Sequence, residues 1–248
     1  MKVSIIMAVF NGAETLQSAL NSVFEQNYDN LELIIVDGAS TDSSIDIIKK
    51  NNSKISYWIS EPDKGIYDAW NKAIKVAHGD YICFIGCDDC FAYPNAIKDL
   101  VDCIGEPNTP PSIISANYRL IDKNGREILV RGDKYSWLAM KVRMAVAHPG
   151  MLHHKGLFNN GGYDTQYSIA ADYELLLRQG PLKNINYLNR VTVLMGNEGV
   201  SNLRVYETLR QVRDIQLKHV SMSRGIFQYS IAILRTYLGN LKKRAWGK

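Results

Sequence analysis

Long apolar runs and cysteines are scarce in this sequence. No apolar segment approaches the ~20 residues that a membrane-spanning helix needs. The first residues, MKVSIIMAVFNGAE, contain an apolar run that is too short for a secretory signal peptide. We therefore expect a cytoplasmic protein whose thiols are free in a reducing compartment, at Cys83, Cys87, Cys90 and Cys103.

Several patterns of well-known binding sites are also missing. There is no G-x-G-x-x-G and no Walker-type loop, which argues against ordinary dinucleotide and P-loop chemistry. Cys87 and Cys90 form one C-x-x-C pair, but no second pair exists, so neither a zinc site nor a redox site is favoured. The net charge of +4 permits an anionic partner without requiring one, and we expect no nucleic acid partner.

Strands and helices alternate through the first half of the chain. The 248 residues are 46% hydrophobic, which suits one large α/β domain or two small ones. Continuous apolar runs predict buried strands at 3–9, 31–36, 55–59 and 81–85. Helices are predicted after an Asn11/Glu14 capping-box pattern, around Ile45 and Ile48, from about Ile66 and from Pro94. This alternation predicts a mostly parallel sheet flanked by helices on both faces.

The second half predicts a hairpin followed by helices. Residues 113–121 and 127–130 flank an Asn-Gly turn signal, which is typical of a β-hairpin. A short helix is predicted at 137–144, and another begins at Asp172. From residue 203 the pattern is helical, with one long helix at 203–220 and a second at 226–241. No Asp or Glu occurs from Ile215 onward, so this C-terminal helical extension is basic.

Acidic and polar residues follow the predicted strands of the first half. Asp88 and Asp89 come just after the strand at 81–85, and Asn11, Asp37 and Asp63 follow the other strands. Ligands of parallel α/β sheets bind outside the carboxyl ends of the strands. The Asp88–Asp89 pair suits a hard divalent cation, Mn²⁺ or Mg²⁺, although a solvated acidic turn is the alternative for the pair taken alone.

The ordered set of motifs resembles the inverting glycosyltransferases of family 2, which have the GT-A fold, and in particular those that build bacterial surface polysaccharides. The resemblance lies in VSIIMAVFNGAETLQSALNSVFEQ, LELIIVDGASTD, SEPDKGIYDAWNKAI, GDYICFIGCDD, HPGMLHHK and GGYDTQYSIAADYELLLR. It implies a GT-A domain at 1–202, in which 1–104 bind a nucleotide sugar and 105–202 bind the acceptor. Residues 203–248 would then be the C-terminal helical extension.

The resemblance assigns donor contacts to residues of the first half. Phe10 would stack on the base of the donor, beside Asn11. The alternative interpretation is that Phe10 is an aromatic residue of the hydrophobic core. Asp37 would accept a hydrogen bond from uracil, or else be a turn residue. Asp63 and Lys64 resemble a loop that closes over the base and the diphosphate, although Lys64 could equally be a solvated turn lysine.

The resemblance also implies a metal site. Asp89 would bind the metal directly, and Asp88 would contact the ribose or a metal-bound water. Many relatives carry another Asp two positions before Asp88, where this chain has Gly86.

Two residues of the second half are implied in contacts with the donor or acceptor. His148 would help to hold the diphosphate or the acceptor, and a satisfied loop histidine is the alternative. Asp172 would be the general base, because an inverting transfer needs a carboxylate to take the proton of the attacking acceptor hydroxyl. Its alternative is an acidic residue that only stabilises a helix N-terminus. Residues 193–201 resemble a loop that covers the donor phosphates.

The resemblance implies a metal-dependent inverting transfer of a hexose or N-acetylhexosamine from a UDP-sugar. The acceptor would be a saccharide, carried on a lipid diphosphate at the inner face of a bacterial membrane, in the synthesis of O-antigen, capsule or exopolysaccharide. The basic extension can lie on an anionic membrane as a peripheral contact, pack on the domain, or form a homodimer contact. One rival function is a nucleotidyltransferase, which would usually carry a Gly-rich basic loop after its first strand. The other is a non-catalytic nucleotide-sugar-binding module.

Overall fold

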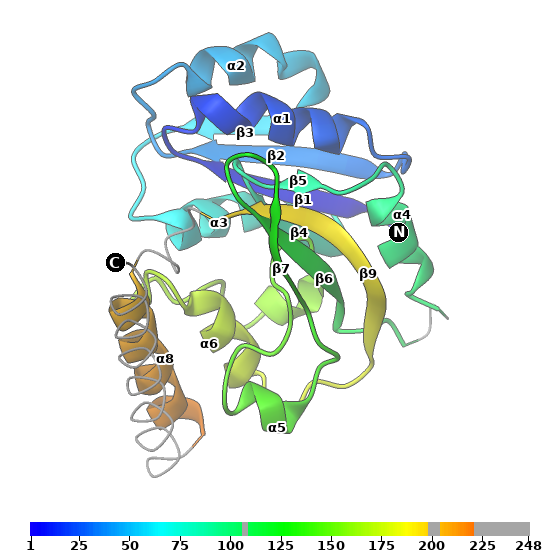
Figure 1. The fold of residues 1–248 in the computed structure, drawn as a ribbon, viewed down its shortest axis with the longest axis vertical. Coiled ribbons are helices and arrows are strands. Elements are labelled where there is room, and N and C mark those ends of the chain that lie inside the picture. Colours follow the sequence, from blue (N-terminus) through cyan, green and yellow to red (C-terminus); the bar gives the residue numbers. More distant parts are fainter. Residues whose placement is uncertain (106–108, 198–203, 221–248) are drawn as a thin grey trace, which may run out of the picture.

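A computed structural model describes residues 1–105, 109–197 and 204–220 (Figure 1). A nine-stranded sheet has the order β3-β2-β1-β4-β8-β6-β9-β5, and β7 pairs with β6. The strands are β1 (Val3–Val9), β2 (Leu31–Asp37), β3 (Tyr57–Ser60), β4 (Tyr81–Gly86), β5 (Cys90–Phe91), β6 (Ile113–Ile121), β7 (Glu127–Arg131), β8 (Leu152–His154) and β9 (Ile185–Gly196). The helices are α1 (Ala13–Phe24), α2 (Ser44–Lys50), α3 (Ile66–Ile74), α4 (Ala96–Asp102), α5 (Trp137–Met140), α6 (Ala171–Arg178) and α8 (Val205–His219), with 3-10 turns η1 (Asn52–Lys54) and η2 (Lys155–Phe158).

The predicted parallel sheet is confirmed in the first half. β1 pairs in parallel with both β2 and β4, and β2 pairs in parallel with β3. These strands are covered on both faces, which is why they are continuous apolar runs rather than alternating ones.

The second half completes the sheet with mixed pairing. β8 is antiparallel to β4 and β6, and the β6–β7 hairpin forms as predicted. β9 runs parallel to β6 and antiparallel to the short strand β5. The prediction of a loop at 193–201 is wrong for its first part, because residues 193–196 end the strand β9. Residues 198–203 lie outside the described residues.

Two hydrophobic cores lie on the two faces of the sheet, with α1 over one face and α3 over the other (Figure 1). On one face, Ile5 and Met7 of β1 pack with Leu16 and Leu20 of α1. On the other face, Ile6 joins a core that contains residues of α3, α6 and α8, including Trp70, Leu176 and Ile215. Neighbouring residues of β1 point to opposite faces, so a single strand serves both cores.

The predicted capping box is wrong. Gly12 is the N-cap of α1, and no side chain of that residue or of Asn11 caps the helix. The side chain of Asn11 instead accepts a hydrogen bond from Thr41 N at 2.8 Å. Asp42 of the β2–α2 loop and Ser44, the first residue of α2, take over the capping. Asp42 accepts from Ala13 N at 2.9 Å, and Ser44 Oγ accepts from Gly12 N at 3.0 Å.

Other element ends differ by a few residues from the prediction. β3 begins at Tyr57 rather than at residue 55, α4 begins at Ala96 with Asn95 as its N-cap, and α5 ends at Met140. The long helix predicted at 203–220 is confirmed as α8. The helix predicted at 226–241 lies outside the described residues. Within the part of the chain that is described, no helix has the length and apolar character needed to cross a membrane.

A buried carboxylate ties the N-terminal ends of the parallel strands together. Glu32 of β2 accepts hydrogen bonds from Ser4 Oγ at 2.5 Å and from His78 N at 2.6 Å, and its other oxygen lies 2.5 Å from Lys2 Nζ. Burial raises the pKa of Glu32, but the hydrogen bonds from Lys2, Ser4 and His78 outweigh it and hold the pKa below its ordinary value.

This lowered pKa makes the stability of the fold depend on pH. A carboxyl group whose pKa is lower in the folded protein stabilises the fold above its unfolded pKa, and that contribution is lost as the pH falls through the folded value. Between neutral pH and about pH 3, wild type should lose more free energy of unfolding than Glu32→Gln does, as urea denaturation can measure. Glu25→Gln, at an exposed position, should lose as much as wild type. Equal losses in wild type and Glu32→Gln would contradict the prediction.

Candidate functional site

The carboxyl ends of β1, β2 and β4 meet at one edge of the sheet. Val9 pairs with Asp37 in the sheet, and Ala8 pairs with Gly86. The loops that leave these strands carry Phe10, Asn11 and the Asp88–Asp89 pair. The expected rim of polar residues is therefore present, and its members come from separate parts of the chain.

Phe10 and Asp63 approach each other at this rim. A side chain at Gly38 would lie 2.6 Å from Asp63 Oδ2 and 3.3 Å from the Phe10 ring, so both side chains lie close to this glycine. The Phe10 side chain is 66% exposed, which excludes the alternative that it is a core aromatic. An exposed ring beside a carboxylate can stack on a heterocyclic base while the carboxylate accepts a hydrogen bond from it.

Asn11 joins the β1–α1 loop to the β2–α2 loop. Its N–H donates to Ser40 Oγ at 2.8 Å, and its side-chain oxygen accepts from Thr41 N at 2.8 Å. Its backbone is left-handed, with φ 49°, and Ala39 in the facing loop is left-handed as well, with φ 61°. Non-glycine residues adopt this conformation at a cost, so the two loops are held in a strained shape at the rim.

Asp37 is fully buried and engaged by hydrogen bonds. Its carboxylate accepts from Ser40 N at 3.0 Å, from Ser40 Oγ at 2.5 Å and from Ser60 Oγ at 2.7 Å. A carboxylate has about four acceptor positions, so little capacity is left for a base. In this structure Asp37 shapes the loop that carries Ser40, and Asp63 is the more accessible acid.

Asp63 and Lys64 stand just before α3. Asp63 Oδ1 accepts from Gly65 N at 2.8 Å, and Lys64 N donates to Asp68 Oδ2 at 3.1 Å. Gly65 has φ 109°, a conformation that favours glycine. The Lys64 side chain is exposed, so its ammonium group is available to an anion.

The acidic pair differs strongly in exposure. Asp88 is exposed, whereas Asp89 is only 5% exposed. Asp89 Oδ2 accepts from Gly86 N at 3.0 Å, while its buried Oδ1 has no hydrogen-bond partner among the described residues. Burial, with the charge of Asp88 beside it, raises the pKa of Asp89 to about 7. An unpaired buried carboxylate oxygen is costly unless a positive group satisfies it.

These residues fit a divalent cation. A side chain at Gly86 would lie 2.6 Å from Asp88 Oδ1 and 3.0 Å from Asp89 Oδ2, so both carboxylates converge over this glycine. Among the residues that the structure describes, no group of three or more His, Cys, Asp or Glu could hold a metal. Mg²⁺ is commonly bound by one or two carboxylates together with substrate phosphates, which is the set that this pair offers.

Burial disfavours the thiolate forms of the neighbouring cysteines. Burial raises the pKa of Cys87 to about 11 and that of Cys83 to about 12. Thiolates, not thiols, bind metals. The four cysteines are free, as expected.

His148 lies in an aromatic cluster below the rim. Its ring stacks on Trp70 at 5.2 Å and on Phe84 at 5.6 Å, and its Nε2 lies 3.1 Å from the Tyr163 hydroxyl. Burial lowers the pKa of His148 to about 3, so the imidazole is neutral. This placement favours the alternative of a satisfied histidine over a cationic contact to a diphosphate.

Asp172 is the second residue of α6 and is half-buried. Its Oδ1 accepts from the Tyr67 hydroxyl at 3.0 Å and from Tyr173 N at 2.8 Å. Within the described part of the chain, no group donates a hydrogen bond to Oδ2. Burial raises the pKa of Asp172 despite these hydrogen bonds. A carboxylate with one unoccupied oxygen and a raised pKa is suited to accept a proton.

Tyr67 is the residue that the sequence analysis missed. It belongs to α3 in the first half, yet its hydroxyl lies 2.7 Å from Ile169 O and 3.0 Å from Asp172 Oδ1. It is separated from Asp172 by 105 residues, so no local spacing could indicate the contact. Asn71, one helical turn later, bonds to both Tyr163 N and Tyr163 O, at 2.7 and 2.8 Å. α3 therefore connects the rim to the acidic residue of α6.

Solved structures share this fold. Staphylococcus aureus TarS, residues 1–349 in complex with UDP, superposes with a TM-score of 0.69 at 19% identity, over 96% of this chain and 72% of that one. The mannosyltransferase PcManGT of Pyrobaculum calidifontis, in complex with GDP-Man and Mn²⁺, has a TM-score of 0.68 at 15% identity, over 100% and 76% of the two chains. The fold is therefore that of GT-A glycosyltransferases, as expected.

Curated relatives point to the same family. A PGL/p-HBAD biosynthesis glycosyltransferase of Mycobacterium bovis is 28% identical over 207 residues, 80% of this chain and 78% of the relative. An uncharacterized glycosyltransferase of Mycobacterium tuberculosis is 28% identical over 230 residues, 88% and 85% of the two. The family model for glycosyl transferase family 2 matches residues 4–147. Because that match covers more than half of the sequence, this chain belongs to glycosyl transferase family 2.

Proposed function

We propose that the protein transfers a hexose or N-acetylhexosamine from a UDP-sugar to a saccharide acceptor, with inversion at the anomeric carbon. The observation that carries the proposal is Asp172, a half-buried carboxylate with a raised pKa and an Oδ2 that no described group occupies. It belongs to α6 in the second half, apart from the rim residues of the first half. A donor on the rim and a base on α6 suit a single displacement, because the base must approach the sugar from the side opposite the leaving group.

The donor would lie on the rim. Phe10 stacks on the base, Asp63 accepts a hydrogen bond from it, and Lys64 contacts the diphosphate. Asn11 and Asp37 hold the two rim loops in the shape that this binding needs. UDP as the nucleotide is supported by the family and by the TarS complexes with UDP and UDP-GlcNAc.

Asp89 and Asp88 would hold Mn²⁺ or Mg²⁺. The buried Asp89 Oδ1 has no partner among the described residues, and the nearby Asp88 carboxylate adds a second ligand group. When bound, the cation offsets the negative charge that develops on the leaving diphosphate. The complex of PcManGT with Mn²⁺ gives a precedent for a metal on this fold.

The transfer is a single displacement. The acceptor hydroxyl oxygen attacks C1 of the donor sugar from the side opposite UDP, and Asp172 Oδ2 takes the hydroxyl proton as the new glycosidic bond forms. The bond from C1 to the diphosphate oxygen breaks, and its electron pair leaves with UDP. Tyr67 and Tyr173 N hold Oδ1, so that Oδ2 keeps its direction.

The acceptor is proposed to be a saccharide on a lipid diphosphate, in the assembly of a surface polysaccharide. The segment 221–248 contains Lys and Arg but no Asp or Glu, so it would attract the anionic inner face of a plasma membrane. A nucleotidyltransferase lacks support, since residues 11–14 hold no Gly-rich basic loop. A non-catalytic binding module would release no UDP when donor and acceptor are mixed, which separates it from the enzyme.

Asp172→Asn keeps the size of the side chain but cannot take the proton. Turnover should fall by about 10²–10⁴-fold, while the affinity for UDP and metal stays near wild type. The loss should appear in kcat rather than in donor KM, because the missing interaction belongs to the transition state. Asp164→Asn, in the preceding loop, is the matched control and should keep turnover within a few-fold. If Asp164→Asn is impaired and Asp172→Asn is not, the base is Asp164.

Asp89→Asn removes a charged ligand while it keeps the size of the side chain. Mn²⁺-dependent binding of UDP, measured by calorimetry, should disappear, because a neutral amide is a weak ligand for a hard cation. The double variant Cys87→Ser/Cys90→Ser should bind UDP and Mn²⁺ as wild type does. Wild-type affinity in Asp89→Asn with Mn²⁺ present would refute the metal assignment.

Truncation after Ser221 tests the membrane contact. Each cation of the removed segment is worth about 1 kcal/mol near an anionic surface, so the truncated chain should no longer sediment with vesicles that contain phosphatidylserine. It should still hydrolyse the donor slowly, because the rim residues and Asp172 are retained. Equal sedimentation of both proteins would show that residues 222–248 are not the membrane contact.

A further inference from the structure

α8 contacts the segment that leads into Asp172. Gln211 is only 7% exposed, and its Oε1 accepts hydrogen bonds from Ile169 N at 2.9 Å and from Ala170 N at 3.2 Å. Its Nε2 donates to Ser168 Oγ at 2.9 Å and lies 3.4 Å from Glu207 Oε1. One side chain of α8 therefore satisfies two consecutive backbone donors just before α6.

The start of α6 has no cap of its own. Ala170 is the N-cap residue, and it has no side chain that could accept a hydrogen bond. The backbone donors at a helix start need partners when they are buried. Gln211 of α8 supplies the acceptor for the N–H of Ala170, which lies two residues before Asp172. The side chain of Ala170 cannot supply one.

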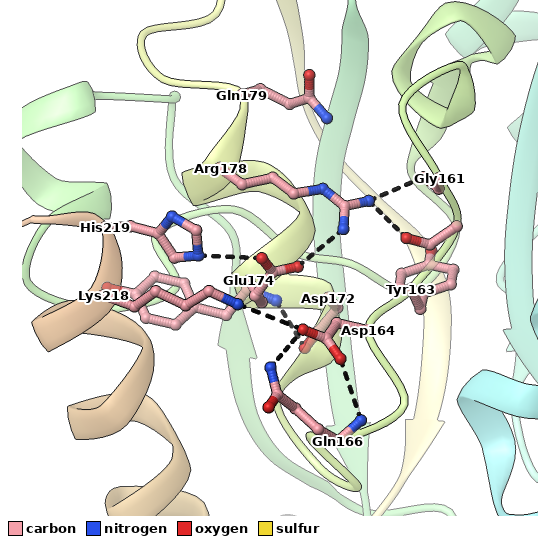
Figure 2. A network of polar contacts seen from close by, with 12 residues as sticks. Gly161, Tyr163, Asp164, Gln166, Asp172, Glu174, Arg178, Gln179, Lys218 and His219 are labelled. Carbon is pink, nitrogen blue, oxygen red and sulfur yellow. Dashed lines mark hydrogen bonds and ion pairs between the residues drawn. The ribbon is translucent and has the colours of Figure 1, made fainter.

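Further contacts hold α8 along α6 (Figure 2). Gln216 Nε2 donates to Val142 O at 2.8 Å and to the Tyr173 hydroxyl at 3.2 Å. His219 Nε2 lies 3.0 Å from Glu174 Oε1, and Lys218 Nζ lies 3.5 Å from Asp164 Oδ2. Since Gln216 and Glu174 are buried as well, α8 is packed into this half of the domain and is not a loosely attached tail.

The peptide segment before Asp172 is thus held from two sides. Tyr67 of α3 contacts Ile169 O and Asp172 Oδ1. Gln211 of α8 accepts from the N–H of the same Ile169. If Gln211 lost its acceptor, the segment at 168–170 could shift relative to Tyr67, and the direction of the Asp172 carboxylate would change with it.

We propose that Gln211 is a positioning residue for Asp172, so that α8 is part of the transfer machinery. This inference rests on the proposed function of Asp172. Gln211 touches neither donor nor acceptor in the proposal and acts only through the first turn of α6. Its loss should therefore lower kcat and leave donor binding at the rim unchanged.

The test compares Gln211→Ala with a double variant in which the side chains of residues 207 and 211 are exchanged. In Gln211→Ala, both N–H groups lose their acceptor, and kcat should fall by about 10- to 100-fold, as small displacements of reacting groups do. Donor KM and the UDP affinity should stay within a few-fold of wild type. The double variant Gln211→Glu/Glu207→Gln exchanges the amide and the carboxylate, keeps the total charge, and keeps an acceptor for both N–H groups. It should recover kcat to within a few-fold of wild type.

Two controls accompany these variants. Glu207→Gln alone keeps the acceptor on Gln211, and Arg210→Ala changes an exposed residue of the same helix. Both should have wild-type kcat. Thermal unfolding and UDP calorimetry on every variant establish that the rim is folded.

Several results would overturn the inference. Gln211→Ala could keep wild-type kcat while Asp172→Asn loses it, or its kcat and UDP affinity could fall together. The exchanged pair could also be as impaired as Gln211→Ala while it still binds UDP. If Asp172→Asn itself retains turnover, the proposed base is wrong, and the inference fails with it; that result is distinct from a failure of Gln211 alone.

Discussion

Parallel pairing in register is the constraint on which this site depends. Because β1 and β2 start and end together, with Val9 opposite Asp37, the loops that follow both strands emerge at one edge. Polar residues that are far apart in sequence therefore face a common space, and the hydrogen bonds between Asn11, Ser40 and Thr41 lock the loops to each other. The strained φ angles of Asn11 and Ala39 are tolerated because this network holds them.

The two acidic sites differ in the groups that surround their carboxylate oxygens. At the end of β4, Asp89 has a raised pKa and an oxygen with no hydrogen-bond partner among the described residues, which is the basis of the proposed cation site. At the start of α6, burial also raises the pKa of Asp172, but two donors bond to Oδ1, and Oδ2 is the atom that we propose accepts the proton. The same side-chain type is thus prepared for different chemistry by the groups around it.

α3 and α8 connect these sites to the rest of the fold. α3 begins at the rim, next to Asp63, and carries Tyr67 to the carboxylate of α6. α8 covers the other side of α6 and adds Ile215 to the second core. The prediction that residues 1–202 form the glycosyltransferase domain and 203–248 an extension stays a prediction. The contacts of α8 nevertheless join its residues to the core of the second half.

The parallel first half, the hairpin, the acidic pair and the family could be predicted before the fold was known, because apolar runs, turn residues and ordered motifs are local properties of the chain. The sequence by itself could not determine the cap of α1, since Asp42 and Ser44 reach that helix only through the pairing of β1 with β2. It also could not show that serine hydroxyls donate hydrogen bonds to the Asp37 carboxylate, or that His148 is buried and neutral. The contacts of Tyr67 and Gln211 with the start of α6 depend on how distant segments pack, and hydrogen bonds between such segments leave no periodic pattern in the chain.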